Sequence, residues 1–301
     1  MASSNKVYDL IADRIMDKLR GGTVPWRKGW NGGEAGMPRN LISGKRYRGI
    51  NVLLLASQGY DSKYWLTYKQ AQGGGGQVRK GQRATPIVFW KRYVKKADAV
   101  ADGDASTGGR VIPVLRYYNV FNADQVDGLR DFPELIEEEN AKGEPVDVDP
   151  IPACEGIVEG FENRPVIEHG GGRACYSPAL DVVSMPERQR FESAEHYYSV
   201  LFHELTHSTG HQSRLGRLKD GGALAAFGST DYSKEELCAE MGSAFLAGMT
   251  GIDSDGLIEN SAAYIKGWLK ALRDNPKWVV LAAAQAQKAV DHILNVKWDQ
   301  G

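Results

Sequence analysis

Residues 202–211 read Phe-His-Glu-Leu-Thr-His-Ser-Thr-Gly-His and contain the pattern HExxH at 203–207. Side chains four positions apart lie on one face of an α-helix, so His203 and His207 can bind the same metal ion through their imidazoles. Glu204 lies beside them, where its carboxylate can accept a proton from a metal-activated water. The stretch therefore predicts a helix that carries a catalytic zinc site, with Glu204 as the general base.

The same five-residue pattern also arises by chance on helices without a metal, and three features favour a metal site. Four of the six histidines lie within the sixteen residues 196–211. The preceding turns, 197–202, are strongly apolar, as expected for a helix in the core of a domain. Ser193 is a suitable N-cap, and Gly210 follows at the place where the helix should end.

A catalytic zinc site needs a third protein ligand and an open fourth position. On a second predicted helix, Glu236 and Glu240 lie four residues apart on one face. This spacing is similar to the gluzincin arrangement, in which the first acid binds zinc and the second orients a ligand histidine. We therefore expect Glu236 as the ligand and Glu240 as the orienting acid, with Glu240 or His211 as alternative ligands. Glu235 is expected to face solvent.

The fold class predicted for the whole chain is α+β. Apolar residues at helical spacing, with Ser, Gly and Pro at the ends, predict helices over 6–20, 193–208, 233–247, 261–273 and 276–294. Alternating and β-branched residues predict strands over 86–94, 111–121 and 180–185, the first two joined as a hairpin by a polar loop over 97–109. Residues 50–57 form a short buried segment, either strand or helix. The stretch 176–186 could pair with an extended peptide if it lies at a sheet edge.

The near-zero net charge of −1 conceals two oppositely charged halves. Residues 1–125 contain 21 Lys and Arg against 9 Asp and Glu, a net charge of +12. Residues 126–301 contain 16 Lys and Arg against 29 Asp and Glu, a net charge of −13. A strongly positive half attracts a polyanion, most often nucleic acid. The alternative is that the basic half docks on the acidic half of its own chain.

Aromatic residues alternate with cations in the basic half, as in Trp26-Arg27-Lys28 and Trp90-Lys91-Arg92. This mixture favours single-stranded nucleic acid, because cations follow the backbone while exposed bases stack on aromatic rings. No basic recognition helix of the kind that reads duplex DNA is predicted. The glycine-rich stretch 73–83 adds cations that could clamp phosphates, or it is a solvated turn. The predicted DNA-binding residues are Trp26, Arg27, Lys28, Arg46, Arg48, Lys69, Arg79, Lys80, Arg83, Lys91 and Arg92.

At ~100–200 residues per domain, 301 residues predict two domains. We expect a basic domain over 1–126, an acidic linker over 127–153 and a mainly helical HExxH domain with a small sheet over 154–301. No apolar run reaches the ~20 residues that a membrane-spanning helix needs, and the N-terminus lacks a secretory apolar core. The three cysteines are widely spaced, which fits a reducing compartment. The expected location is therefore the cytoplasm.

The ordered set of stretches along the chain resembles the ArdC-type antirestriction proteins of conjugative plasmids. The N-terminal stretches are YDLIADRIMDKLRGGTVPWRKGW (8–30), GKRYRGINVLLL (44–55), WLTYKQA (65–71) and GGGGQVRKGQRATPIVFWKR (73–92). The C-terminal stretches are YSPALDVVSMP (176–186), FHELTHSTGH (202–211), SKEELCAEMGSAFL (233–246) and AAYIKGWLKAL (262–272). The N-terminal set is similar to a domain that TraC-type plasmid primases share, and the C-terminal set to the family's zinc metallopeptidase domain.

This resemblance implies that the N-terminal domain binds single-stranded DNA and that the protein protects incoming plasmid DNA from host restriction during conjugation. It also implies a zinc-dependent metalloendopeptidase site at His203, His207 and Glu204, although Mn²⁺ and other divalent ions suit such ligands too. An unidentified protein substrate would be a second partner, and no membrane partner is expected. A non-catalytic DNA-binding protein with a structural metal is the alternative. A nuclease or primase is disfavoured, because the basic half has no acidic two-metal cluster.

Overall fold

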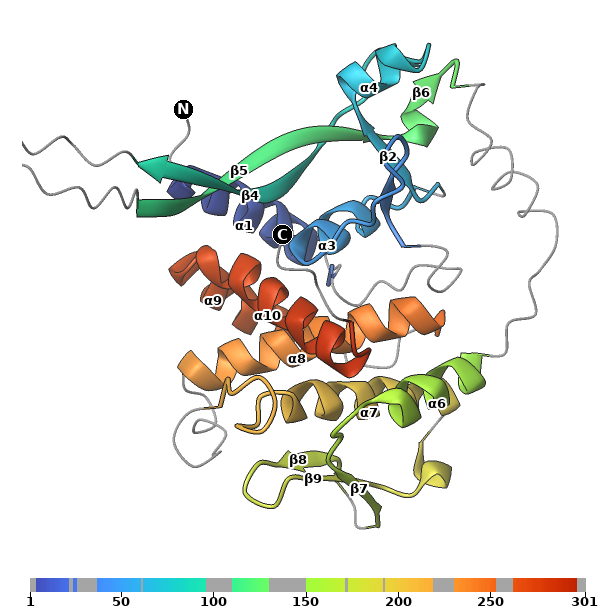
Figure 1. Ribbon diagram of the computed structural model, residues 1–301, viewed down its shortest axis with the longest axis vertical. Helices are drawn as coiled ribbons and strands as arrows, with labels where there is room; N and C mark the ends of the chain where they lie inside the picture. Colours follow the sequence, from blue (N-terminus) through green and yellow to red (C-terminus); the bar gives the residue numbers. More distant parts are fainter. Residues whose placement is uncertain are drawn as a thin grey trace, which may run out of the picture.

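The computed structural model describes residues 4–21, 24–25, 37–60, 62–95, 110–129, 150–170, 173–191, 193–218, 230–252 and 262–296. The N-terminal half consists of a sheet with helices against one side, and the C-terminal half is a stack of helices above a small sheet (Figure 1). The predicted α+β class is thus confirmed.

The N-terminal half is built on a four-stranded sheet of order β1-β2-β5-β4. β4 (Thr85–Lys95) and β5 (Arg110–Asn122) form a long antiparallel ladder, which confirms the predicted hairpin. The loop predicted over 97–109 lies outside the described residues. The remaining strands and short helices of this half are β1 (Arg39–Asn40), β2 (Tyr64–Thr67), α4 (Tyr68–Gly73), β3 (Gln77–Val78), η1 (Ala123–Gln125) and β6 (Val126–Asp127).

Two helices pack on the sheet, α1 (Ser4–Arg20), as predicted, and α3 (Ile50–Ala56). The segment left open as strand or helix is thus a helix. It lies between β4 and α10, so it is buried on several sides and shows no amphipathic pattern. The Asn51 side chain fastens it to the sheet, because its amide exchanges two 2.7 Å hydrogen bonds with the backbone of Val88.

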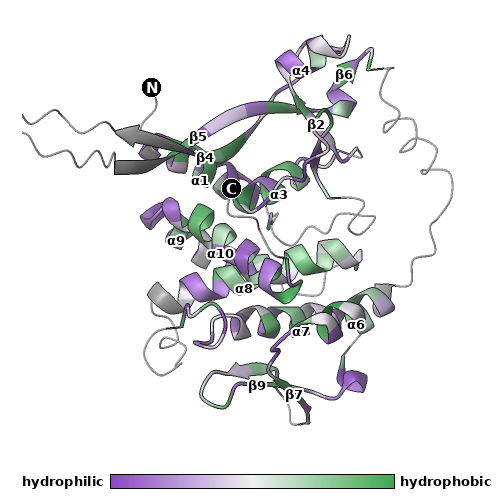
Figure 2. Cartoon of the chain, viewed as in Figure 1, coloured by the Kyte–Doolittle hydropathy of each residue, from purple (hydrophilic) through white to green (hydrophobic). Residues whose placement is uncertain are grey.

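The C-terminal half is mainly helical, as predicted. Its helices are α6 (Pro150–Gly160), α7 (Ala194–Ser208), α8 (Thr230–Thr250), α9 (Ala262–Asp274) and α10 (Lys277–Ile293). α8 is the central helix, because α7 and α10 both pack against it, and it is hydrophobic along much of its length (Figure 2). α6 begins inside the predicted linker, and residues 130–149 of that linker lie outside the described residues.

A small sheet of order β7-β9-β8 lies beside α7. It contains β7 (Val166–His169), β8 (Cys175–Ser177) and β9 (Val182–Met185), followed by η2 (Arg188–Arg190). The strand predicted over 180–185 starts two residues late, because Asp181 has a φ of 52° and belongs to the turn. β9 is the middle strand, so the edge available to an extended peptide is β8, at the start of the stretch 176–186.

The basic and acidic halves share one hydrophobic core. Ile11 and Ile15 of α1 belong to the same buried cluster as Ala283 and Val290 of α10. Polar contacts also cross between the halves, since the Gly49 N–H donates to Gln287 Oε1 over 3.0 Å. Part of the basic half therefore docks on the acidic half, as the alternative explanation of the charge division proposed.

Within the part of the chain that the structure describes, no helix combines the length and the apolar character needed to cross a bilayer.

Candidate metal centre

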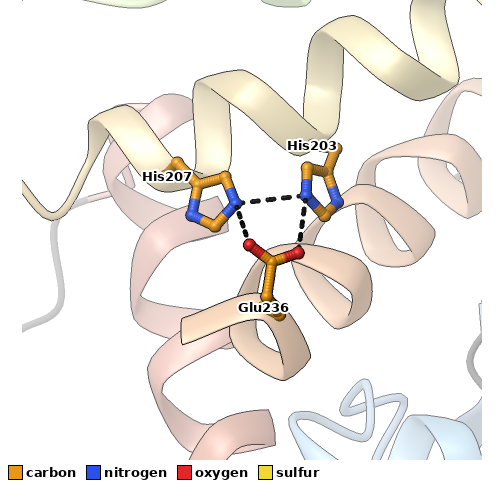
Figure 3. A group of neighbouring side chains, drawn as sticks. All are labelled: His203, His207 and Glu236. Atoms are coloured by element: carbon orange, nitrogen blue, oxygen red, sulfur yellow. Dashed lines mark hydrogen bonds and ion pairs between the residues drawn. The ribbon is translucent and has the colours of Figure 1, made fainter. Parts of the chain in front are cut away.

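The two histidines of the HExxH pattern face one another on α7. The Ser193 hydroxyl accepts a hydrogen bond from the His196 N–H and caps the helix, as predicted. His203 and His207 project from the same face one turn apart, with their Nε2 atoms 3.1 Å from each other (Figure 3). His207 is almost completely buried, and 19% of the His203 side chain is exposed.

Glu236 of α8 completes the group. Its Oε2 lies 3.6 Å from His203 Nε2 and its Oε1 lies 3.5 Å from His207 Nε2, so each oxygen faces one imidazole (Figure 3). Donor atoms bound to a tetrahedral zinc at ~2.0–2.1 Å lie about 3.3 Å apart. The three residues therefore fit a divalent metal in both donor type and spacing.

A close approach of α7 and α8 sets this geometry. A Cβ added to Gly242 of α8 would lie 2.5 Å from Thr206 Cγ2 of α7, closer than any normal contact. Glycine at this position lets the two backbones come together, and Glu236 reaches the histidines from less than two turns away along the same helix.

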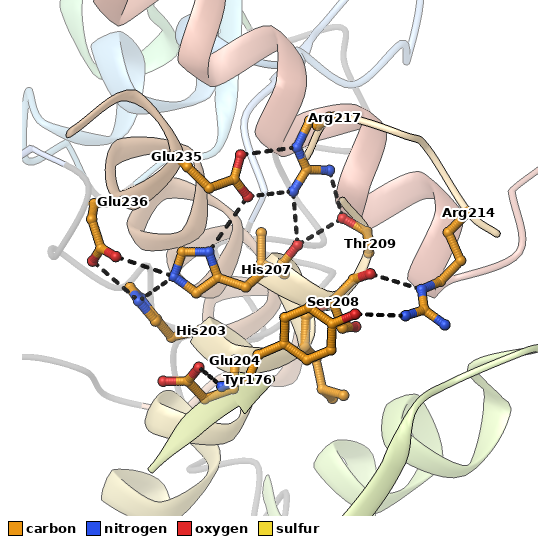
Figure 4. Close-up of polar contacts among 12 residues, drawn as sticks. Tyr176, His203, Glu204, His207, Ser208, Thr209, Arg214, Arg217, Glu235 and Glu236 are labelled. Carbon is orange, nitrogen blue, oxygen red and sulfur yellow. Dashed lines mark hydrogen bonds and ion pairs between the residues drawn. The ribbon is translucent and has the colours of Figure 1, made fainter. Parts of the chain in front are cut away.

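The carboxylate that orients His207 is Glu235, not Glu240. Glu235 Oε1 lies 3.4 Å from His207 Nδ1, the nitrogen that points away from the metal position (Figure 4). The expectation that Glu235 faces solvent was therefore wrong, since its side chain is only 14% exposed. Among the contacts of the described residues, none joins Glu240 to either histidine. The helical wheel failed here because Arg217, in the segment that follows α7, pairs with Glu235 and lies against its carboxylate.

Arg217 in that segment is part of the site, and the sequence did not reveal it. Its guanidinium donates to Glu235 Oε1 over 2.8 Å and to the Thr209 hydroxyl over 2.7 Å (Figure 4). It also donates to the Thr206 carbonyl over 2.9 Å. Arg217 thus ties the acid that holds His207 to the end of α7. A lone arginine in a polar loop carries no local signal for this role.

Burial and neighbouring charged groups shift the pKa values of His207 and Glu236 in opposite directions. Burial alone lowers the pKa of His207, but hydrogen bonds to Glu235 and Glu236 outweigh it and raise that pKa to about 10. Burial raises the pKa of Glu236, yet the two imidazoles hold it far below its usual value. The metal-free cluster therefore retains a proton that a bound cation must displace.

Glu204 lies on the side of α7 that faces the small sheet. Its Oε2 accepts a hydrogen bond of 2.8 Å from the Tyr176 N–H on the β8 edge (Figure 4). The Tyr176 hydroxyl in turn donates to Asp181 Oδ1 over 2.8 Å, and Arg214 pairs with the same carboxylate. The Arg214 Nε also donates to the Ser208 carbonyl over 2.7 Å, which links this group of residues to the end of α7.

The two alternative metal ligands lie outside the cluster. His211 Nδ1 is 2.7 Å from the Ser213 hydroxyl, within the turn that follows α7. Glu240 lies one turn beyond Glu236 on α8 and does not belong to the group of ligand atoms that converge within 4.8 Å. Of the three third-ligand candidates from the sequence, the geometry thus brings Glu236 to the histidines.

Comparison with known proteins identifies both halves. Two family models match in order, the N-terminal domain of anti-restriction factor ArdC over residues 5–121 and a zincin-like metallopeptidase over residues 157–285. The metal-free crystal structure of the antirestriction ArdC protein from plasmid R388 matches with a TM-score of 0.71 and 35% identity, over 95% of this chain and 96% of that chain. The chain belongs to the ArdC family. The Mn(II)-bound structure of the R388 protein matches with the same TM-score of 0.71, over 96% of this chain and 97% of that chain.

Longer proteins contain the same ArdC-like region. Two DNA primases TraC of Escherichia coli are 36% and 37% identical in alignments 308 and 305 positions long, which cover 98% and 95% of this chain. The chain spans only 20% and 27% of the length of those primases. The uncharacterized protein y4eC of Sinorhizobium fredii is 34% identical, over 95% of this chain and 90% of that protein.

The residues predicted to bind DNA in the ArdC N-terminal domain divide into three groups. Exposed side chains on the described surface are Arg46, Lys69, Lys80, Arg83 and Lys91. Two others are engaged within the chain: Arg48 pairs with Asp291 of α10, and Arg79 lies 3.2 Å from Asp127. Trp26, Arg27, Lys28 and the side chain of Arg92 lie outside the described residues.

Proposed function

We propose that this ArdC-family protein protects incoming plasmid DNA from host restriction in the cytoplasm of a recipient cell during conjugation. The basic half binds single-stranded DNA, and the acidic half is a zinc-dependent metalloendopeptidase. The observation that carries the catalytic part is the convergence of His203, His207 and Glu236, with Glu204 held beside them. Three protein ligands leave an open position, which is typical of catalytic rather than structural zinc sites.

His203, His207 and Glu236 would hold the ion, and Glu235 would fix the ring orientation of His207. When bound, Zn²⁺ supplies a Lewis acid that activates water near neutral pH and polarises a carbonyl. The Tyr176 N–H occupies Oε2 of Glu204, so we assign Oε1 to receive the proton of the attacking water. Glu204 then returns this proton to the amine that leaves from the cleaved peptide bond.

Zinc and manganese are both compatible with two imidazoles and a carboxylate. The R388 protein has a structure with Mn(II) bound, so Mn²⁺ is the alternative to zinc for this chain. Metal content of the protein purified without chelator, measured by plasma mass spectrometry, separates the two ions. Zinc near one equivalent supports the proposal, and manganese in its place would correct it.

The proposed function is tested by conjugating an unmethylated plasmid into recipients with and without a restriction system. We expect expression of the protein to raise transfer into the restricting recipient, and Glu204→Gln to abolish this effect. The matched control is Glu240→Gln, which removes a glutamate outside the metal cluster and should leave protection intact. Full protection by the Glu204→Gln variant would instead support a non-catalytic DNA-binding protein with a structural metal.

Single-strand binding is measured on the full chain, because its two halves share one core. Affinity for a single-stranded oligonucleotide and for its duplex is compared across a salt series. We expect tighter binding to the single strand and a steep loss of affinity with salt. Equal affinity for duplex would contradict the single-strand proposal.

A further inference from the structure

Within the part of the chain that the structure describes, exposed aromatic side chains are confined to the basic half. Among the described residues, those with more than a third of their surface exposed are Tyr60, Tyr68, Trp90, Tyr117 and Tyr118. The aromatic side chains described in the acidic half are all buried or half-buried. Other aromatic residues of the basic half, such as Trp65 and Tyr64, belong to the core. The structure thus separates the rings that could meet a partner from those that stabilise the fold.

Three of these exposed rings lie on the β4–β5 hairpin, and one of them is part of a stacked pair. The rings of Phe89 and Tyr118 are nearly parallel, with centroids 4.5 Å apart and an interplanar angle of 17°. Tyr118 is still 54% exposed, although Phe89 lies against one side of its ring. The pair therefore leaves a broad aromatic surface on the outside of the sheet.

Cations share the face of the sheet that carries this pair. In the ladder Phe89 lies opposite Arg116 and Ile87 lies opposite Tyr118, so these four side chains point to the same side. Lys91 is two residues beyond Phe89 and belongs to that side as well. We call Phe89, Lys91, Arg116 and Tyr118 the hairpin platform.

A hollow of about 400 Å³ adjoins the hairpin platform, lined by Val7, Arg116, Tyr117, Tyr118 and Asn119. It lies along β5 before the residues that pair with β2, since β2 pairs only with Val120, Phe121 and Asn122. This size is within the range of sites that take small organic groups. Because side chains alternate along a strand, Arg116 and Tyr118 border it from the platform side and Tyr117 and Asn119 from the α1 side, so the hollow lies at the open edge of β5. An aromatic ring beside a guanidinium suits a planar heterocycle attached to a phosphate.

We propose that the hairpin platform and its hollow bind an unpaired base of single-stranded DNA, with the base stacked on Tyr118 and the neighbouring phosphate near Arg116. This inference rests on the proposed single-strand binding and assigns it a site. The net charge of +12 over residues 1–125 favours a polyanion. It also disfavours a second copy of the chain, because two such faces would repel each other. Bases in a duplex are already paired and stacked, so the site selects single strands.

The experiment measures binding of the full chain to a labelled single-stranded oligonucleotide and to an abasic oligonucleotide of the same length. We expect Tyr118→Ala to weaken binding of the normal strand about 5- to 150-fold, the range for loss of one base–aromatic stack. The dependence of affinity on salt should not change, because no cation is removed. Tyr118→Phe keeps the ring and should bind within about twofold of the unaltered protein.

Two controls separate a stacking site from other roles. Leu281→Ala removes a side chain that is 48% exposed on α10 and should not alter binding. The abasic strand should bind the unaltered protein and the Tyr118→Ala variant equally. Unchanged affinity of Tyr118→Ala for the normal strand would overturn the inference, as would an equal loss on the abasic strand. Failure of the unaltered protein to bind any single strand would instead overturn the proposed function.

Two further measurements address folding and self-association. If Tyr118→Ala lowers the melting temperature, photocrosslinking of a 5-iodouracil strand to the unaltered protein replaces it. A crosslink mapped to β5 supports the site, and crosslinks confined to other segments overturn it. Sedimentation of the unaltered protein and of Tyr118→Ala tests a dimer through this face. A dimer that the substitution dissociates would overturn the DNA assignment.

Discussion

Glu235 provides the sharpest test of how the metal centre is held. Its Oε1 lies 3.4 Å from His207 Nδ1, so Glu235→Gln removes the charge that stabilises the Nδ1–H of a metal-binding histidine. Partners of this kind contribute about 10- to 100-fold in metal affinity, or ~1.4–2.7 kcal/mol. Arg217 already offsets part of this charge from 2.8 Å away. We therefore expect Glu235→Gln to lower the zinc affinity by about tenfold, near the lower end of that range.

The same substitution removes the only charged partner that the described contacts give Arg217, whose side chain is 9% exposed. Removing one member of a buried ion pair costs ~3–5 kcal/mol. The hydrogen bonds of Arg217 to Thr206 and Thr209 remain, so we expect the free energy of unfolding of the metal-free protein to fall by about 3 kcal/mol. Adding Arg217→Met to Glu235→Gln removes the unpaired charge. It should restore part of the stability but not the metal affinity.

The assay is a Zn²⁺ titration against a chromogenic chelator, with urea unfolding of the metal-free protein alongside. Glu240→Gln is the matched control, since it removes a carboxylate from the same helix outside the cluster. The reasoning is refuted if Glu240→Gln weakens zinc binding as much as Glu235→Gln does. It is equally refuted if the double variant binds zinc as tightly as the unaltered protein.

Other contacts make three more predictions. Zinc affinity should rise up to tenfold per pH unit between about pH 7 and 9, because zinc displaces the proton of His207, whose pKa is raised to about 10 in the metal-free site. Calorimetry in buffers of different ionisation enthalpy counts the protons released on zinc binding. A zinc affinity that does not change with pH would contradict this prediction. Gly242→Ala places a Cβ 2.5 Å from Thr206 and should lower the free energy of unfolding by ~1–3 kcal/mol. Its control is Gly156→Ala, whose added Cβ has no atom within 4 Å and should leave the free energy of unfolding unchanged or raise it by up to ~1 kcal/mol. Urea unfolding measures both variants. Arg48→Gln removes the ion pair with Asp291 and should cost about 1 kcal/mol of stability without changing single-strand affinity; a shallower salt dependence of binding would show that Arg48 contacts DNA instead.

Zinc binding should also stabilise the fold, because the cluster joins α7 to α8. A ligand that binds only the native state adds about 2.7 kcal/mol at 100 times its Kd. We therefore expect a chelator to lower the melting temperature of the metal-loaded chain and added zinc to restore it. An identical melt with and without chelator would count against a metal that bridges the two helices.

Local patterns in the sequence were sufficient for the elements that carry the site. The cap at Ser193, the apolar turns and the four-residue spacing of His203 and His207 act within one helix, so they required no knowledge of the fold. The β4–β5 hairpin was also predicted, because the alternation of side chains acts within each strand. The segment that forms α3 was ambiguous, because a helix buried between a sheet and another helix loses the polar face that identifies it.

The sequence by itself determined the α+β class, the histidine pair with the adjacent Glu204, and the division of charge. Only the tertiary structure decided which acids meet the histidines, because that depends on the close contact at Gly242 and on the segment that places Arg217 over Glu235. It also decided which aromatic rings are exposed and which cations, such as Arg48, pair within the chain. Helical and strand periods report which side of an element a residue faces. The neighbour that covers that side comes from distant parts of the chain.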